Sequence, residues 1–186
     1  MRFTIPNILT FFRLVAAPCV ALSLILNLSA VIALSIFLLA SITDYADGYL
    51  ARVLNQSTSL GKVLDPIADK AMVIITLCFL HYSFESDMTK IFFGIPAIVI
   101  IFREIIVSGL REYIGGKAKS LAVTRLSKWK TALQMVAIGV LLTSNVAYFS
   151  ALPLNFIGLL VLWLASIVTV ITGLDYIKKS LIHLNG

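Results

Sequence analysis

Two stretches of this chain contain no charged residue and are each long enough to cross a lipid bilayer. They run from residue 131 to 149 and from residue 152 to 174, and a membrane-spanning helix needs about 20 apolar residues. The composition agrees with this, because 60% of the residues are hydrophobic and 13% are charged, against about 45–50% and 25% in soluble domains. The sequence therefore predicts an all-α integral membrane protein.

Further apolar runs extend the pattern to six predicted transmembrane helices. We expect these helices near residues 8–28, 30–54, 61–82, 91–113, 125–149 and 152–176. Six crossings place both termini on the same side of the membrane. Six spans also use nearly all of the chain, so we expect residues 1–186 to form a single transmembrane domain.

The basic residues predict which side of the membrane faces the cytoplasm. With the helices placed as above, 14 of the 15 Lys and Arg residues lie on the side of the termini, and only Lys90 lies opposite. Cytoplasmic loops of membrane proteins are enriched in Lys and Arg, so both termini are expected to be cytoplasmic. The same bias accounts for the net charge of +6 without a nucleic acid partner.

The second, third and fourth predicted helices carry charged residues, all in their cytoplasmic halves. These residues include Asp44, Asp47, Lys62, Asp65, Asp69, Lys70, Arg103, Glu104, Arg111 and Glu112. A charge inside the bilayer costs at least about 2.5–3.5 kcal/mol on insertion scales, so such groups face one another or a water-filled cavity. We therefore expect a polar cavity that opens to the cytoplasm.

Four aspartates on two neighbouring helices are expected to meet in this cavity. Asp44 and Asp47 are three residues apart and Asp65 and Asp69 are four apart, so each pair lies on one helix face. At a rise of about 1.5 Å per residue, the two pairs reach overlapping depths in an antiparallel hairpin. Carboxylates this close repel unless protons or cations neutralise them. Oxygen ligands favour hard cations such as Mg²⁺, Mn²⁺ or Ca²⁺.

Salt bridging and ion transport are alternative roles for the aspartates. They could form salt bridges with Arg52, Lys62 and Lys70, or they could bind the transported ion of a cation transporter. A transporter is expected to have polar groups on a path to the outer face, or broken helices at the midplane. The outer halves of the second to sixth predicted helices hold no charge, which favours an enzyme.

The aspartates belong to a longer pattern that carries a family resemblance. The chain reads Asp44-x-x-Asp47-Gly48-x-x-Ala51-Arg52, then eight residues, then Gly61-x-x-x-Asp65-x-x-x-Asp69. This pattern resembles the signature of the CDP-alcohol phosphotransferase family, and all eight defining positions match. Three more stretches, 5–13, 103–112 and 128–135, resemble the members of that family that use glycerol 3-phosphate as acceptor.

The resemblance implies a reaction, its cofactors and its setting. The expected reaction transfers a phosphatidyl group from CDP-diacylglycerol to sn-glycerol 3-phosphate and gives phosphatidylglycerophosphate and CMP, a step of phospholipid biosynthesis. The implied cofactors are two Mg²⁺ or Mn²⁺ ions, the implied assembly is a homodimer, and the implied location is the bacterial inner membrane. Another acceptor, such as inositol phosphate, serine or phosphatidylglycerol, would keep the same chemistry.

The resemblance also assigns roles to residues of the signature. Asp44, Asp47, Asp65 and Asp69 would bind the metal ions, and Asp69 would also take the proton of the acceptor hydroxyl as general base. The residues expected to accommodate CDP-diacylglycerol are Asn7, Thr10, Gly48, Ala51, Arg52 and Gly61. The small residues could instead allow close helix packing, and Asn7 and Thr10 could instead cap the first helix.

The phosphate of the acceptor needs cationic partners. Glu104, Ser108 and Arg111 share one stripe of the fourth predicted helix. Arg111 is the first candidate, because a guanidinium group can bind phosphate through two parallel hydrogen bonds. Further candidates are Lys130, Lys128 and Arg125 at the start of the fifth helix. Basic residues at cytoplasmic helix ends can instead anchor the protein at the membrane surface.

Overall fold

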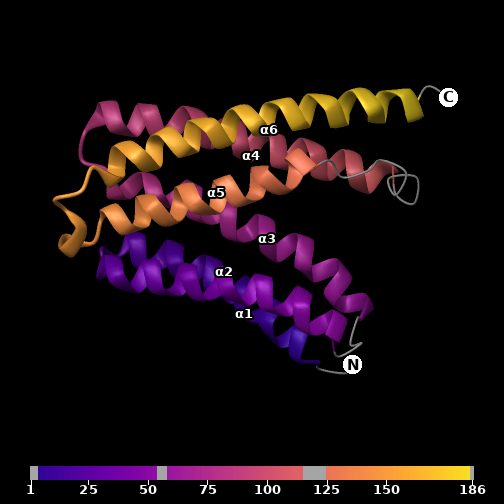
Figure 1. Ribbon diagram of the computed structural model, residues 1–186, viewed down its shortest axis with the longest axis horizontal. Helices are drawn as coiled ribbons and strands as arrows, with labels where there is room; N and C mark the ends of the chain where they lie inside the picture. Colours follow the sequence, from indigo (N-terminus) through magenta and orange to yellow (C-terminus); the bar gives the residue numbers. More distant parts are fainter. Residues whose placement is uncertain (1–3, 54–57, 115–124, 185–186) are drawn as a thin grey trace.

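The computed structural model describes residues 4–53, 58–114 and 125–184, and within these ranges the chain is helical and has no strand. Six long helices run side by side along the long axis of the molecule (Figure 1). They are α1 (Ile5–Ile25), α2 (Ala30–Val53), α3 (Ser59–Leu80), α4 (Asp87–Ile114), α5 (Arg125–Ser144) and α6 (Leu154–Leu184). The start of α1 and the end of α6 lie at the same end of the molecule (Figure 1), as expected for an even number of antiparallel helices.

The helix positions confirm the predicted order, with differences at the ends. α3 begins at Ser59 rather than 61, because the Thr58 side chain caps it by accepting a hydrogen bond from the Gly61 N–H at 3.0 Å. α5 ends at Ser144, and a separate 3₁₀ turn, η3 (Ala147–Phe149), follows it. α6 continues to Leu184 rather than ending near 176, and an ion pair between Lys179 and Asp175 spans one of its added turns at 2.7 Å.

A short turn joins α1 to α2 as an antiparallel hairpin. Asn27 in this turn has a φ of 48°, a left-handed conformation that Asn tolerates better than most residues. The Leu28 N–H donates to the Ser23 carbonyl at 2.9 Å, which closes the end of α1. The hairpin sets α1 directly beside α2, and α3 packs on the other side of α1.

The six helices pack as two groups of three, α1–α2–α3 and α4–α5–α6. Contacts of α2 and α3 with α5 connect the two groups. Figure 1 shows the first group below the second, and in this view α3 is the helix of the first group that lies nearest to the second. The buried hydrophobic core is formed by selected positions within residues 16–20 of α1, 33–40 of α2, 72–80 of α3, 93–100 of α4, 137–142 of α5 and 162–165 of α6. Most of these positions lie away from the termini. Packing is therefore tight in that half, and the half near the termini is left free to form a polar site.

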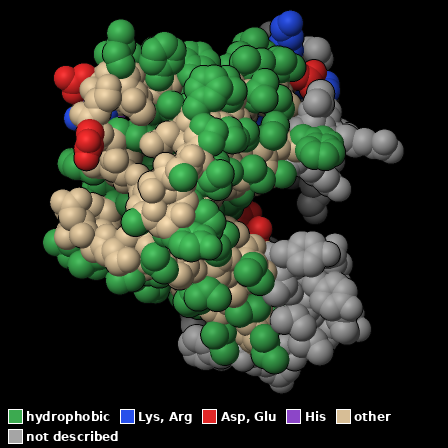
Figure 2. All heavy atoms as spheres, turned by 60° about the vertical axis from the view of Figure 1, so that its left-hand side comes forward, with side chains coloured by type: hydrophobic (Ala, Val, Ile, Leu, Met, Phe, Trp, Pro, Cys, Tyr) green, Lys and Arg blue, Asp and Glu red, His purple; other side chains and the backbone are tan. Residues whose placement is uncertain are grey.

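Within the described residues, three helices are long and apolar enough to cross a membrane, namely α1, α4 and the part of α6 up to Leu181, and the Ala30–Asp44 part of α2 is apolar but shorter. Large hydrophobic side chains also cover much of the outer surface, as Figure 2 shows. Both observations are consistent with the predicted membrane protein.

Candidate active site

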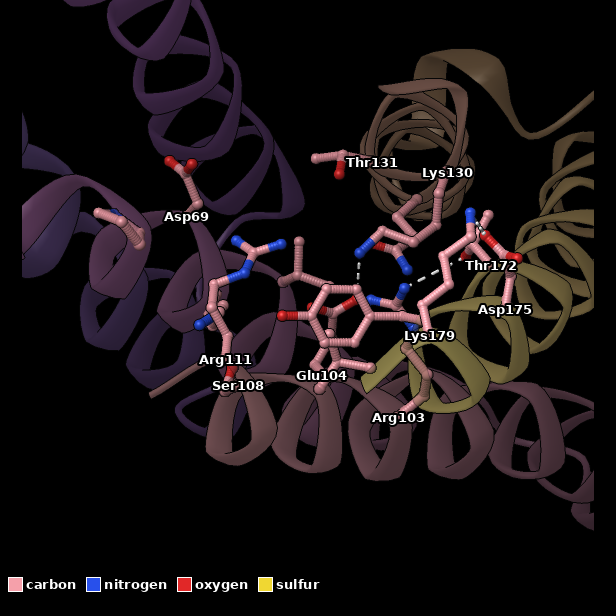
Figure 3. Close-up of a pocket in the computed structure, with 16 residues that line it drawn as sticks. Asp69, Arg103, Glu104, Ser108, Arg111, Lys130, Thr131, Thr172, Asp175 and Lys179 are labelled. Carbon is pink, nitrogen blue, oxygen red and sulfur yellow. Dashed lines mark hydrogen bonds and ion pairs between the residues drawn. The ribbon is translucent and has the colours of Figure 1, made fainter. Parts of the chain in front are cut away.

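A polar cavity of about 240 Å³ lies between α3, α4, α5 and α6. Among the described residues, its lining includes five basic and three acidic side chains, which gives these residues a formal excess of two positive charges. The basic residues are Lys70, Arg103, Arg111, Lys130 and Lys179, and the acidic residues are Asp69, Glu104 and Asp175. Figure 3 shows these helices arranged around the cavity, with Asp69 on one side and Lys179 on the other. The structure therefore contains the expected polar cavity, and α5 and α6 line it as well as α3 and α4.

Three of the four predicted metal-binding aspartates come together at one edge of this cavity. Asp44 of α2 and Asp69 of α3 both contact the same nitrogen, Nη1, of Arg13, and Asp65 lies 3.7 Å from its Nη2. The Asp44, Asp65 and Asp69 side chains are each more than 40% exposed, whereas Arg13 is 2% exposed. Asp44 of the first expected pair thus lies beside both aspartates of the second, with a guanidinium group among them.

Asp69 connects the carboxylate cluster to the cavity. Of the cluster's described carboxylates, it alone lines the cavity, and it also contacts Arg13 together with Asp44. Among the described residues, no group of three His, Cys, Asp or Glu side chains is arranged to hold a metal ion as it stands. The side chain of Asp47, the fourth predicted ligand, lies outside the described residues.

One face of α1 is built against these carboxylates. Thr10 donates a hydrogen bond to Asp65 at 2.6 Å, and Asn7, one turn earlier, accepts one from Thr58 at 2.8 Å. Both side chains are buried. α1 begins at Ile5, and its N-cap, Thr4, makes no side-chain capping bond. The alternative in which Asn7 and Thr10 cap the first helix is therefore wrong, because both lie inside the helix and point at α3.

The position of Gly61 is tightly packed in this structure, so the absence of a side chain does not open space for a ligand. A Cβ atom at this position would lie 3.0 Å from the Asn7 Oδ1 and 3.2 Å from the Thr58 Oγ1. The missing side chain lets α1 approach the first turn of α3, so this small residue serves close helix packing. The side chains of the remaining predicted donor-site residues, Gly48, Ala51 and Arg52, lie outside the described part of the chain.

A buried ion network lies at the opposite end of the cavity. Glu104 of α4 contacts Lys130 of α5, and its neighbour Arg103 lies 3.3 Å from the same carboxylate. Arg103 also donates to Thr172 of α6 at 3.2 Å, as the dashed line in Figure 3 indicates. Lys130, a predicted phosphate ligand, is only 7% exposed. Glu104 already compensates its charge, so Lys130 offers an anion less attraction than a freely exposed lysine would.

Arg111 extends from α4 into the cavity on the side of Asp69 (Figure 3). Its guanidinium carbon lies 5.7 Å from the ring centre of Tyr176 on α6, a cation–π distance. Two hydroxyl groups of the cavity lining, Ser108 Oγ and Tyr176 OH, are buried without a hydrogen-bond partner among the described residues. Arg111 and these hydroxyls give the cavity unused hydrogen-bonding capacity. The side chains of the other predicted phosphate ligands, Arg125 and Lys128, are outside the described residues.

Comparison with known proteins places this site in a family. The family model for CDP-alcohol phosphatidyltransferase matches residues 3–171 of the chain. The chain belongs to this family. The match contains all four aspartates, Arg13 and Arg111, and it ends just before the α6 residues of the cavity.

Several curated relatives are similar over nearly the full length. A protein of Cereibacter sphaeroides is 40% identical, with 99% of this chain and 98% of the relative covered. A Rickettsia bellii protein is 41% identical over 94% and 93%, and one of Haemophilus influenzae is 38% identical over 96% and 94%. All three are named CDP-diacylglycerol–glycerol-3-phosphate 3-phosphatidyltransferase.

Sequence reasoning missed several residues of this family member's site, Arg13 and Tyr176 among them. Arg13 stands out in the sequence only as a basic residue that interrupts the first apolar run, although a lone charge inside a transmembrane helix is itself a signal for a functional partner. Tyr176 lies at the predicted end of the sixth helix, whereas in the structure α6 continues past it and Tyr176 lines the cavity. Nothing in the local sequence distinguishes it from an interfacial aromatic residue.

Proposed function

We propose that this protein transfers a phosphatidyl group from CDP-diacylglycerol to sn-glycerol 3-phosphate and releases phosphatidylglycerophosphate and CMP. The observation that carries the proposal is the identity of about 40% with enzymes named for this activity, over almost the whole length of both chains. The cavity is compatible with these substrates, because carboxylates lie at one edge and the lining has an excess of positive charge.

The carboxylate cluster is proposed to hold two divalent cations, Mg²⁺ or Mn²⁺, through Asp44, Asp47, Asp65 and Asp69. The residues fit such ions in their chemistry, because oxygen ligands from α2 and α3 converge on one positive group in this structure. When bound, divalent ions neutralise the diphosphate of the donor. Asn7, Thr10, Gly48, Ala51, Arg52 and Gly61 are proposed to shape the donor site, with Gly61 acting by allowing α1 to approach α3.

The acceptor is proposed to occupy the cavity between Asp69 and Arg111. Arg111 binds its phosphate group, and the hydroxyls of Ser108 and Tyr176, which have no hydrogen-bond partner in the described part of the chain, supply further hydrogen bonds. Lys130 contributes positive charge from the buried network, and Arg125 and Lys128 are proposed to add to it at the start of α5. Asp69 takes the proton of the acceptor hydroxyl, since it lines the acceptor cavity and also belongs to the carboxylate cluster.

We further propose that six helices cross the bacterial inner membrane with the cavity open to the cytoplasm. The support is the enrichment of Lys and Arg near the termini and the placement of the cavity in the half of the molecule that the hydrophobic core leaves free. A lipid donor can then enter from the inner leaflet and a water-soluble acceptor from the cytoplasm. The homodimer implied by the family resemblance is part of the same proposal.

An assay of CMP release tests this function. The purified protein in detergent is supplied with CDP-diacylglycerol, Mn²⁺ or Mg²⁺ and, in separate reactions, glycerol 3-phosphate, inositol phosphate, serine or phosphatidylglycerol. We expect release with glycerol 3-phosphate that stops when EDTA is added. Release with a different acceptor would keep the chemistry and overturn the acceptor assignment. Activity that persists in EDTA would remove the metal ions from the proposal.

A further inference from the structure

Arg13 is a deeply buried charged group in contact with the carboxylate cluster. Its side chain is 2% exposed and contacts aspartates from two other helices, Asp44 on α2 and Asp69 on α3. Asp65, the third, lies 3.7 Å from its Nη2. Among the described residues, no other Lys or Arg forms an ion pair with these three carboxylates. α1, which supplies this cation, carries none of the aspartates of the family signature.

Charge balance explains why a cation lies here. Carboxylates held close together repel one another strongly in a medium of low dielectric constant. A buried guanidinium group likewise needs carboxylate partners to offset the loss of its hydration. Arg13 and the aspartates therefore stabilise one another without any bound metal ion. One positive charge still leaves three carboxylates with a net negative charge, which continues to attract divalent cations.

We infer that Arg13 is a positioning residue whose fixed charge holds Asp44, Asp65 and Asp69 together before metal binding and competes with the metal for the same oxygens. This inference rests on the metal binding proposed above. Its geometric basis is that the Arg13 Nη1 contacts the Oδ1 atoms of both Asp44 and Asp69. A divalent cation bound to either oxygen must take over a contact that Arg13 now makes.

The inference makes two predictions for Arg13→Gln, which removes the charge and keeps a polar side chain. In EDTA the melting temperature of the detergent-purified protein falls, because the carboxylates lose their compensating cation. Mn²⁺ binds more tightly, with a dissociation constant roughly tenfold lower, since a competing unit charge within contact distance is removed. Titration calorimetry on EDTA-stripped protein measures the affinity, and melting curves with and without Mn²⁺ measure the stability. Neither measurement uses activity.

Arg103→Gln is the matched control. Arg103 is also largely buried and ion-paired, but its partners are Glu104 and Thr172 rather than the cluster. The Arg103→Gln substitution should lower the melting temperature in EDTA and leave the Mn²⁺ dissociation constant unchanged. A purely structural role of Arg13 would give this same pattern. Unchanged or weaker Mn²⁺ binding by Arg13→Gln therefore overturns the inference.

A second variant covers the case in which Arg13→Gln does not fold even when purified with Mn²⁺. Arg13→Lys then replaces it, because lysine keeps a positive charge for folding but its side chain ends one atom short of the Nη1 that contacts Asp44 and Asp69, which weakens its competition with the metal for those oxygens. Mn²⁺ binding tighter than wild type is expected for this variant, and equal or weaker binding overturns the inference. If the wild-type protein binds neither Mn²⁺ nor Mg²⁺, the proposed metal site fails, and the inference about Arg13 fails with it.

Discussion

Asp69 is the described carboxylate that belongs both to the aspartate cluster and to the cavity wall. We expect Asp69→Asn to keep the protein folded and largely able to bind the donor, and to lower kcat by a factor of about 10² to 10⁴, the usual contribution of a general base. Single-turnover measurement of CMP release checks this. Donor binding is measured separately, by equilibrium titration with CDP-diacylglycerol.

The control for this variant is Asp87→Asn, the same change at the opposite end of the molecule. The Asp87 side chain is 95% exposed, and its ion-pair partner among the described residues is Lys90 at 3.5 Å, so its loss should leave kcat unchanged. Wild-type turnover in Asp69→Asn would remove the general-base role from this residue.

Arg111 is expected to contribute to acceptor binding. Arg111→Ala should raise the apparent KM for glycerol 3-phosphate about tenfold or more, since a charged hydrogen bond contributes about 1.5–3 kcal/mol, and should change the KM for CDP-diacylglycerol much less. Lys178→Ala, which removes an exposed charge near the same end of the molecule, serves as control. A larger effect on the donor KM would move Arg111 to the donor site.

Among the helices, α5 and α6 pack closely at Gly158. A Cβ atom at Gly158 would lie 2.6 Å from Leu141 side-chain carbons and 3.3 Å from the Leu141 backbone nitrogen, and Leu141 is fully buried. Gly158→Ala should therefore destabilise the protein by about 1–3 kcal/mol, the usual cost of overpacking. Thermal melting in detergent measures the loss.

Gly94 of α4 is the matched control, since a Cβ atom there meets nothing within 4 Å. Gly94→Ala should leave the melting temperature unchanged or raise it slightly, because alanine favours the helix. Equal melting temperatures for the two variants would contradict the close approach of α5 to α6.

For the whole molecule, the proposed orientation can be tested by labelling single cysteines. In a variant with Cys19 and Cys78 replaced by serine, Lys90→Cys should react with a membrane-impermeant maleimide added to intact bacterial cells with a permeabilised outer membrane. Lys178→Cys should react only after the inner membrane is disrupted. The reverse pattern would place the cavity on the outer side.

The helical membrane fold, the order of the helices and the clustering of the aspartates could all be predicted from the amino-acid sequence. These features follow from local rules, because apolar runs of bilayer length form helices and residues three or four apart share a helix face. The spacing that brings Asp44, Asp65 and Asp69 together is therefore visible in the chain itself. The family pattern around these residues can likewise be read directly from the amino-acid sequence.

Which side chains from distant helices meet depends on tertiary packing. Arg13 joins the aspartate cluster because α1 packs against both α2 and α3, and Lys130 pairs with Glu104 because α5 faces α4 across the cavity. Tyr176 reaches Arg111 because α6 continues beyond the apolar run. Contacts of this kind depend on how helices pack around a shared core. Helical spacing within one segment carries no information about such packing.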